Sequence, residues 1–254
     1  MKTKAKKQLT LWQRAAALLF WLLVWQAASM LVGSELLLAS PVTALKTLCG
    51  LAVQAGFWAT AFTSLWRIFL GFLLAALAAA LLAWMSSRFS ACRFLVSPLV
   101  DVLKAVPVAS FIILALMWVS GRQLSTLISF LMVFPVLYGN TLAGFDCADT
   151  QLLEMAYVFR LSGFKKFKAI YLPAALPSFT AGCRTGIGLA FKSGVAAEVI
   201  GLPAGTIGEK LYEAKLFLST GELFAWTAVL ILLSILCEKL ILWLLKLLCR
   251  GVRL

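Results

Sequence analysis

The sequence has no histidine and few charged residues, and both shortages narrow the functions open to it. Only 13% of its 254 residues are charged, and none of its six cysteines stands in a Cys-x-x-Cys pair. This composition argues against a zinc site and against a cysteine–histidine nucleophile. The phosphate-binding pattern Gly-x-x-x-x-Gly-Lys-Ser/Thr is also missing, since the glycine-rich stretch 201–210 has another spacing. We expect no metal site, no cofactor and no ATP hydrolysis by this chain.

Most of the chain is apolar. Apolar residues make up 63% of the chain, and they occur in runs of about 18 or more, long enough for a helix to cross a bilayer. The runs are continuous rather than alternating, which argues against a β-barrel. The sequence predicts an all-α polytopic membrane protein with about six transmembrane helices. The predicted spans are 15–32, 64–85, 96–119, 124–144, 174–200 and 223–248.

The net charge of +13 is best explained by orientation in the membrane. The basic residues lie between the apolar runs, and no aromatic-basic motif for nucleic acid is present. If the N-terminus is cytoplasmic, the outside segments hold only Lys46, Arg122, Lys210 and Lys215. The inside segments hold Lys2, Lys4, Lys6, Lys7, Arg14, Arg88, Arg93, Arg160, Lys165, Lys166, Lys168, Arg250 and Arg253. The positive-inside rule thus predicts a bacterial plasma-membrane protein with both termini in the cytoplasm.

The chain divides into an N-terminal region, 1–58, and a core, 59–254. The first apolar run resembles a signal peptide, but it is long and rich in Trp, and no small-x-small cleavage site clearly follows. We expect an uncleaved first span. After it, Ser40 and Pro41 are typical of a helix start, and the apolar spacing that follows predicts a short amphipathic helix on the outer surface.

The longest inside loop, 145–173, has helical signals of its own. Asp149 can cap a helix that starts near Thr150. Gly163 is expected to break that helix and to form a turn that a residue with a Cβ would resist. A second short helix then carries basic residues, and Pro173 fits the first turn of the next span. The loop is predicted to be two short helices joined by a glycine turn.

This loop resembles the EAA motif of ABC-importer permeases, in which Glu-x-Ala is followed by a glycine and later by a hydrophobic residue and Leu-Pro. The matching residues are Glu154, Ala156, Gly163, Ile170, Leu172 and Pro173, and Met155 replaces the middle alanine. Further segments resemble the nitrate/sulfonate/taurine branch of the binding-protein-dependent permeases. These segments are TSLWRIFLGF (63–72), LKAVPVASFIILALMW (103–118), FPVLYGNTLAGF (134–145) and AEVIG (197–201).

The resemblance implies that the loop is a coupling helix held in a groove of a separate cytoplasmic ATPase subunit. Ala156 would leave room for close docking, and Glu154 is expected in the first helical turn, where its charge favours the helix dipole. An extracytoplasmic solute-binding protein and a small anionic solute, such as a sulfonate, taurine or nitrate, are also implied. Since six spans form a half-sized pathway, we expect a permease homodimer.

Charged residues inside the predicted spans need a reason, because each costs on the order of 3 kcal/mol near the bilayer centre. Arg67 can snorkel outward, and Asp101 and Lys104 can pair on one helix face. Arg184, Lys192 and Glu198 share the fifth span. They fit either a tightly packed helix with paired charges, including a pair of Lys192 with Glu198, or a cation-lined route for an anion.

Three classes of protein remain in competition. A single-chain secondary transporter would need internal repeats or broken helices, and no convincing repeat is visible. A membrane enzyme or receptor would need a polar constellation that the chain does not assemble. The importer permease is the favoured interpretation, with either a small anion or a neutral heterocycle as its solute.

Overall fold

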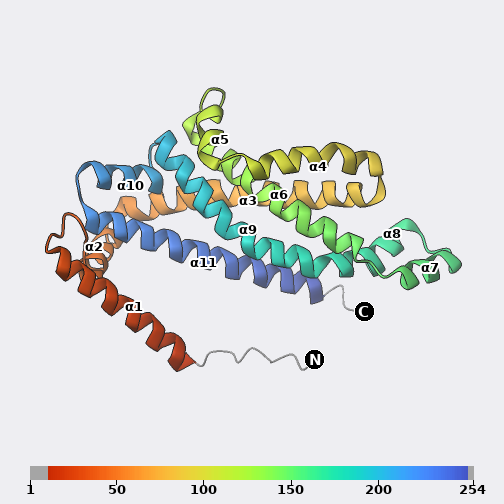
Figure 1. Cartoon of the computed structure of the whole chain (residues 1–254), viewed down its shortest axis with the longest axis horizontal. Coiled ribbons are helices and arrows are strands. Elements are labelled where there is room, and N and C mark those ends of the chain that lie inside the picture. Colours follow the sequence, from red (N-terminus) through yellow and green to blue (C-terminus); the bar gives the residue numbers. More distant parts are fainter. Residues whose placement is uncertain (1–10, 251–254) are drawn as a thin grey trace.

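The computed structural model describes residues 11–250, and every regular element in this part of the chain is helical (Figure 1). The prediction of an all-α chain is confirmed. Lys2, Lys4, Lys6, Lys7 and Arg253, which entered the orientation argument, lie outside the described residues. The elements are α1 (Leu11–Val32), α2 (Pro41–Ala52), α3 (Ala55–Arg88), α4 (Ser90–Ala105), α5 (Val108–Ala115), α6 (Gly121–Asp146), α7 (Thr150–Val158), α8 (Gly163–Lys166), the π-helical turn η1 (Phe167–Tyr171), α9 (Leu172–Gly201), α10 (Ile207–Leu216) and α11 (Thr220–Arg250).

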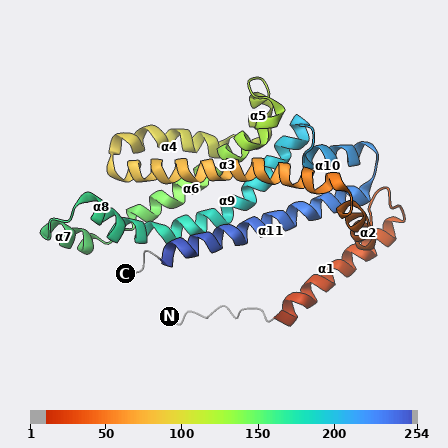
Figure 2. The same cartoon turned by 180° about the vertical axis from the view of Figure 1, so that it is seen from behind.

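Three long helices, α3, α6 and α9, form the centre of the molecule, and α6 packs against both of the others (Figure 2). Glycines allow this close contact. A Cβ on Gly71 of α3 would overlap the carbonyl oxygen of Thr126 in α6, and one on Gly144 of α6 would lie 2.8 Å from Cα of Ala175 in α9. Small residues at such crossings are typical of helices that pack in a membrane, where close contact replaces the hydrophobic effect.

Four helices, α1, α3, α6 and α11, are long and apolar enough to cross a membrane, and α4 with α5 makes a fifth if that bent pair is one span. The predicted fifth span is present as α9, which has 30 residues. Its glycines, prolines and charged side chains lower its mean hydropathy, so α9 is not counted among the helices apolar enough to cross a membrane.

The predicted third span, 96–119, is not one straight helix. α4 ends at Ala105, α5 starts at Val108, and the two helices are bent by 102°. Pro107 explains the break, because proline has no backbone N–H to donate and disfavours the helical conformation in the residue before it. Val106 accordingly has an extended backbone, with φ −79° and ψ 130°.

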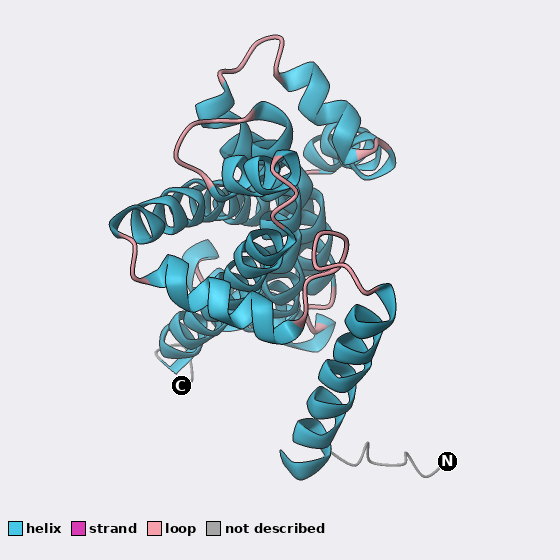
Figure 3. Cartoon of the chain, turned by 90° about the vertical axis from the view of Figure 1, so that its left-hand side faces the viewer, coloured by secondary structure: helices cyan, strands magenta, loops and turns pink. Residues whose placement is uncertain are grey.

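The short helices α2 and α10 lie at one end of the bundle (Figures 1 and 2), and α1 stands apart from the other helices (Figure 3). α1 is held near its C-terminal end, where the indole of Trp25 donates a hydrogen bond to the carbonyl of Ala39 at 3.1 Å. The predicted helix after Ser40 is confirmed as α2, with Ser40 Oγ accepting the N–H of Thr43. α3 starts at Ala55, so the last residues of the predicted N-terminal region are continuous with the core.

Candidate functional site

The segment 145–173 projects beyond the ends of α6 and α9 (Figures 1 and 2). It contains α7, α8 and η1. The side chain of Asp149 accepts the backbone N–H of Gln151 at 2.9 Å, directly before α7 starts at Thr150. The predicted pair of short helices, and the Asp149 cap of the first one, are therefore confirmed.

The turn after α7 is formed by an arginine and not by the predicted glycine. Arg160 has a left-handed backbone with φ 49°. The N–H of Leu161 donates to the carbonyl of Ala156 at 2.9 Å, and the N–H of Arg160 donates to that of Tyr157 at 3.0 Å. These two bonds form the Schellman arrangement that ends many helices, in which the left-handed position is usually glycine.

Gly163 has a different place from the one predicted. It is the first residue of α8, after Ser162, whose hydroxyl accepts the N–H of Lys165. Its φ is not positive, and a Cβ added to it would meet nothing within 4 Å. The prediction that Gly163 forms the turn after α7 is therefore wrong. Within residues 11–250, no clash requires a glycine at this position.

The other motif residues divide into buried and exposed positions. Ala156 is only 2% exposed and Ile170 is also buried, so both pack inside the loop. Ala156 thus packs within its own chain and does not open a docking surface. Glu154 is exposed, and it is the fifth residue of α7 rather than part of the first turn, so the helix-dipole argument does not apply to it. Leu172 and Pro173 begin α9 as expected.

Large apolar side chains cover the outside of this loop, and we call them the loop apolar surface. Tyr157 is 79% exposed and Phe159 is 70% exposed. The members of the surface are Leu152, Met155, Tyr157, Val158, Phe159, Leu161 and Phe164. Exposed apolar side chains that gather in one place mark contact surfaces for a protein, a membrane or a ligand.

An aromatic cluster connects this loop to the bundle. The Trp84 ring of α3 lies 4.4 Å from Phe167 and 5.2 Å from Tyr171 of η1, and 5.4 Å from Phe145 of α6, measured between ring centroids. Arg88 lies 5.7 Å from the rings of both Trp84 and Tyr171. The sequence reasoning missed this cluster. Its local signals are the four-residue spacings of Phe167 with Tyr171 and of Trp84 with Arg88, each one helical turn.

The three charged residues of α9 have separate surroundings. Arg184 pairs with Glu238 of α11 at 3.2 Å, although the arginine side chain remains 67% exposed. Lys192 is exposed, and within residues 11–250 it forms no ion pair or side-chain hydrogen bond. Glu198 is fully buried. The structure therefore does not bring these three side chains together in one chain.

Glu198 is the centre of a buried polar cluster between α3, α9 and α10. Its Oε2 accepts the hydroxyl of Ser64 at 2.7 Å and the backbone N–H of Gly208 at 3.3 Å. The Ser64 hydroxyl in turn accepts the N–H of Ile207 at 2.8 Å. Arg67 is close enough to attract the carboxylate electrostatically. These hydrogen bonds connect the first turn of α10 to α3 and α9.

The predicted pair of Asp101 and Lys104 does not form. Both side chains are exposed, and none of the ion pairs within residues 11–250 joins them. They lie in the last turns of α4, just before the bend at Pro107. Arg67 also differs from its prediction, because its Nη1 atom is buried and has no hydrogen-bond partner among the described residues, rather than reaching outward.

Comparisons with known proteins point to one family. The family model described as "Binding-protein-dependent transport system inner membrane component" matches residues 68–254. SsuC of Bacillus subtilis strain 168, a permease named for aliphatic sulfonates, is 32% identical over 208 residues, which cover 80% of this chain and 74% of SsuC.

Two further relatives carry other solute names. TauC of Escherichia coli K12, the taurine transport system permease protein, is 27% identical over 220 residues, which cover 84% of this chain and 80% of TauC. RibX of Chloroflexus aurantiacus, the riboflavin transport system permease protein, is 27% identical over 152 residues and 57% of each chain.

Proposed function

We propose that this chain, which belongs to the family of binding-protein-dependent transport system inner membrane components, forms the solute pathway of an ATP-driven importer for sulfonate-like anions. The chain is an ABC transporter permease and not an enzyme, as its relatives are transport subunits. Transport, rather than chemistry, is therefore what its helices have to perform.

The loop apolar surface is the observation that carries the coupling part of this proposal. It lies on the loop that holds the EAA-like residues, and that loop projects from the bundle. Exposed aromatic side chains such as Tyr157 and Phe159 are the residue types that anchor protein interfaces. The proposed partner is a cytoplasmic ATPase subunit that binds this surface and moves α9, which follows the loop directly.

Copurification of the ATPase subunit tests this assignment. Phe159→Asp places a charge in the loop apolar surface and should weaken ATPase capture roughly thirtyfold, the loss expected for a residue worth about 2 kcal/mol. Phe217→Asp is the matched control, because Phe217 is 77% exposed at the other end of the molecule. Equal ATPase capture by both variants would reject the loop as the docking surface.

The solute part of the proposal comes from the relatives. SsuC and TauC are named for aliphatic sulfonates and taurine, and a sulfonate keeps its negative charge at any physiological pH. An anion crossing a low-dielectric region needs a cation or water beside it. Lys192, exposed and without an ion-pair partner in residues 11–250, is the residue of α9 that is most available for this role.

The remaining partners follow from the architecture of such an importer. We propose an extracytoplasmic solute-binding protein and two copies of this chain around one route. The loop 145–173 would lie in the cytoplasm, and the end of α11 lies at the same end of the bundle (Figure 1), which is consistent with a cytoplasmic C-terminus. The mass of the purified complex checks the stoichiometry, and one permease copy per complex would contradict it.

A neutral heterocycle is the second candidate solute, because RibX, named for riboflavin, is also a relative. Ligand identification on the cognate binding protein separates the two candidates. Capture of a sulfonate such as taurine supports the first proposal, whereas capture of an uncharged ring compound supports the second.

A further inference from the structure

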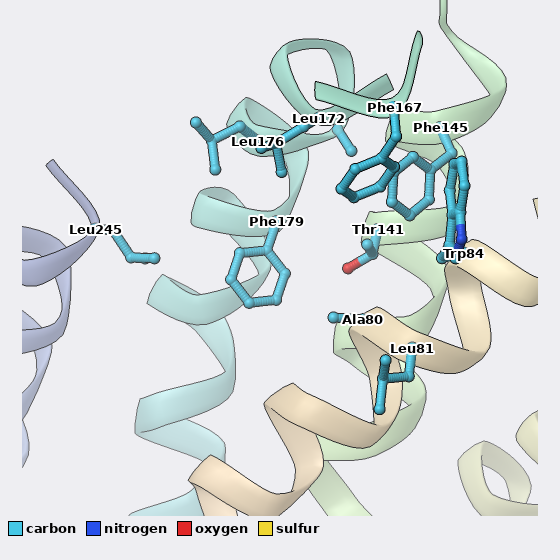
Figure 4. A pocket seen from close by; sticks show the side chains of 11 residues that line it. Ala80, Leu81, Trp84, Thr141, Phe145, Phe167, Leu172, Leu176, Phe179 and Leu245 are labelled. Carbon is cyan, nitrogen blue, oxygen red and sulfur yellow. The ribbon is translucent and has the colours of Figure 1, made fainter. Parts of the chain in front are cut away.

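An apolar cavity of about 460 Å³ lies where the coupling loop joins the bundle (Figure 4). Five elements contribute to its walls, with Trp84 from α3, Phe145 from α6, Phe167 from η1, Phe179 from α9 and Leu245 from α11. It has room for several methylene groups of a flexible chain.

The walls of this cavity offer almost no hydrogen bonds to an occupant. Thr141 is the hydroxyl-bearing residue among them, and its Oγ1 already donates to the carbonyl of Leu137 in its own helix at 2.6 Å. A cavity with such apolar walls is poorly suited to water or to a polar solute. It favours an aliphatic occupant, since burial of each methylene is favourable.

The residues around the cavity carry positive charge. Arg88 lies against the Trp84 ring, Lys168 follows the wall residue Phe167, and Lys246 follows the wall residue Leu245. All three side chains are exposed. Asp146, the acidic residue next to the wall residue Phe145, is already paired with Arg93 at 3.1 Å. The charge beside the cavity is therefore positive and not neutralised by this carboxylate.

We propose that this cavity binds one acyl chain of an anionic phospholipid, with the lipid phosphate beside Arg88. Basic pockets between membrane helices on the cytoplasmic side are suited to such headgroups. The leaflet assignment rests on the proposed function, because it requires the loop to be cytoplasmic. A lipid bound here would contact Trp84 and Phe167 together, and so would stabilise the contact between the coupling loop and α3.

Native mass spectrometry of the full-length chain tests the site, with phosphatidylglycerol and phosphatidylcholine of identical acyl chains as probes. We expect preferential retention of phosphatidylglycerol. Arg88→Gln should reduce that preference roughly fivefold, the effect expected for one basic residue near a lipid phosphate. Arg122→Gln is the matched control, since Arg122 is also exposed but lies in the first turn of α6, at its far end.

A second variant examines the acyl chain. Ala80→Phe adds a ring to the cavity from α3 (Figure 4) and should lower retention of both lipids by about tenfold or more, because it displaces several methylenes. Unchanged retention in Ala80→Phe, or equal retention of the two lipids by the unmodified chain, would overturn the proposal. So would loss of the dimer with unchanged lipid binding, which would indicate that a second copy fills the cavity. The measurement uses no solute, ATP or ATPase, so its failure is distinct from failure of the transport proposal.

Discussion

A buried carboxylate needs donors, and the first turn of α10 supplies one of them to Glu198. The N–H of Gly208 and the hydroxyl of Ser64 both donate to Oε2, while Oε1 has no hydrogen-bond partner among the described residues. Glu198 therefore acts first as a link between α9 and α10, and its burial sets it apart from the exposed Lys192.

Gly208→Ala tests this link. A Cβ at position 208 would overlap Cβ of Glu198 and lie 2.6 Å from its carbonyl carbon, so α10 must move away from α9. Overpacking of this kind costs about 1–3 kcal/mol, and thermal unfolding in detergent should occur at a lower temperature. Gly188→Ala is the control, because nothing lies within 4 Å of that position. A destabilisation of equal size in both variants would mean that the α9–α10 contact is not the cause.

Gly163 offers a second test at the scale of one residue. A Cβ at Gly163 would meet no described atom within 4 Å, and the φ of Gly163 is not positive. Gly163→Val should therefore leave membrane insertion and thermal stability unchanged. We nevertheless expect reduced ATPase capture and reduced uptake, since the added side chain would stand at the proposed docking surface. Gly56→Val, which is equally open but at the start of α3, should change neither. Normal capture and uptake by Gly163→Val would remove Gly163 from the docking surface.

At the scale of elements, the aromatic cluster connects the loop 145–173 to α3 and α6 of the bundle. Trp84 contacts α6 and η1 at once, so a displacement of η1 must either move α3 or separate these rings. Aromatic pairs contribute about 0.5–1.5 kcal/mol beyond their buried area. This is enough to keep the loop and α3 moving together rather than independently.

Trp84→Ala should uncouple the motion of the loop 145–173 from that of α3. Removal of a large aromatic side chain from a packed site costs about 3–5 kcal/mol, and here much of that loss falls on the contact with η1. We expect faster hydrogen exchange in 167–171 and weaker stimulation of ATPase activity by loaded binding protein, with ATPase capture retained. Trp66→Ala, a change on the same helix at a side chain that is 55% exposed, should leave both measurements unchanged.

The elements that the sequence predicted well are those with a local signal. Continuous apolar runs predicted the long helices, and Asp149 and Ser40 marked helix starts that the structure confirms. The bend at Pro107 also has a local signal, but the continuous apolar run around it favours a single span. The left-handed residue was placed at Gly163 because glycine adopts that conformation most easily, whereas Arg160 occupies it. Contacts such as Ser64 with Glu198, 134 positions apart, have no local signal.

At the scale of the whole molecule, the exposed Lys192 of α9 is consistent with the proposed assembly of two copies. Lys192 lies near the middle of the second half of a 30-residue helix, and it is exposed without a partner in the described residues. A lysine facing lipid at that depth would cost on the order of 3 kcal/mol. The assembled transporter should therefore surround Lys192 with water, solute or a second copy rather than with lipid.

Lys192→Met decides between a pathway role and a structural role for this cation. The substitution keeps a long side chain and removes the charge. If Lys192 meets the solute, uptake of a sulfonate probe such as taurine should fall by about tenfold or more, the loss of a hydrogen bond to a charged group, while the complex with the ATPase remains assembled. Lys192→Arg retains the charge and should keep much of the uptake. Intact assembly with unchanged uptake in Lys192→Met would reject the pathway role, and loss of assembly would instead identify Lys192 as a contact between the two copies.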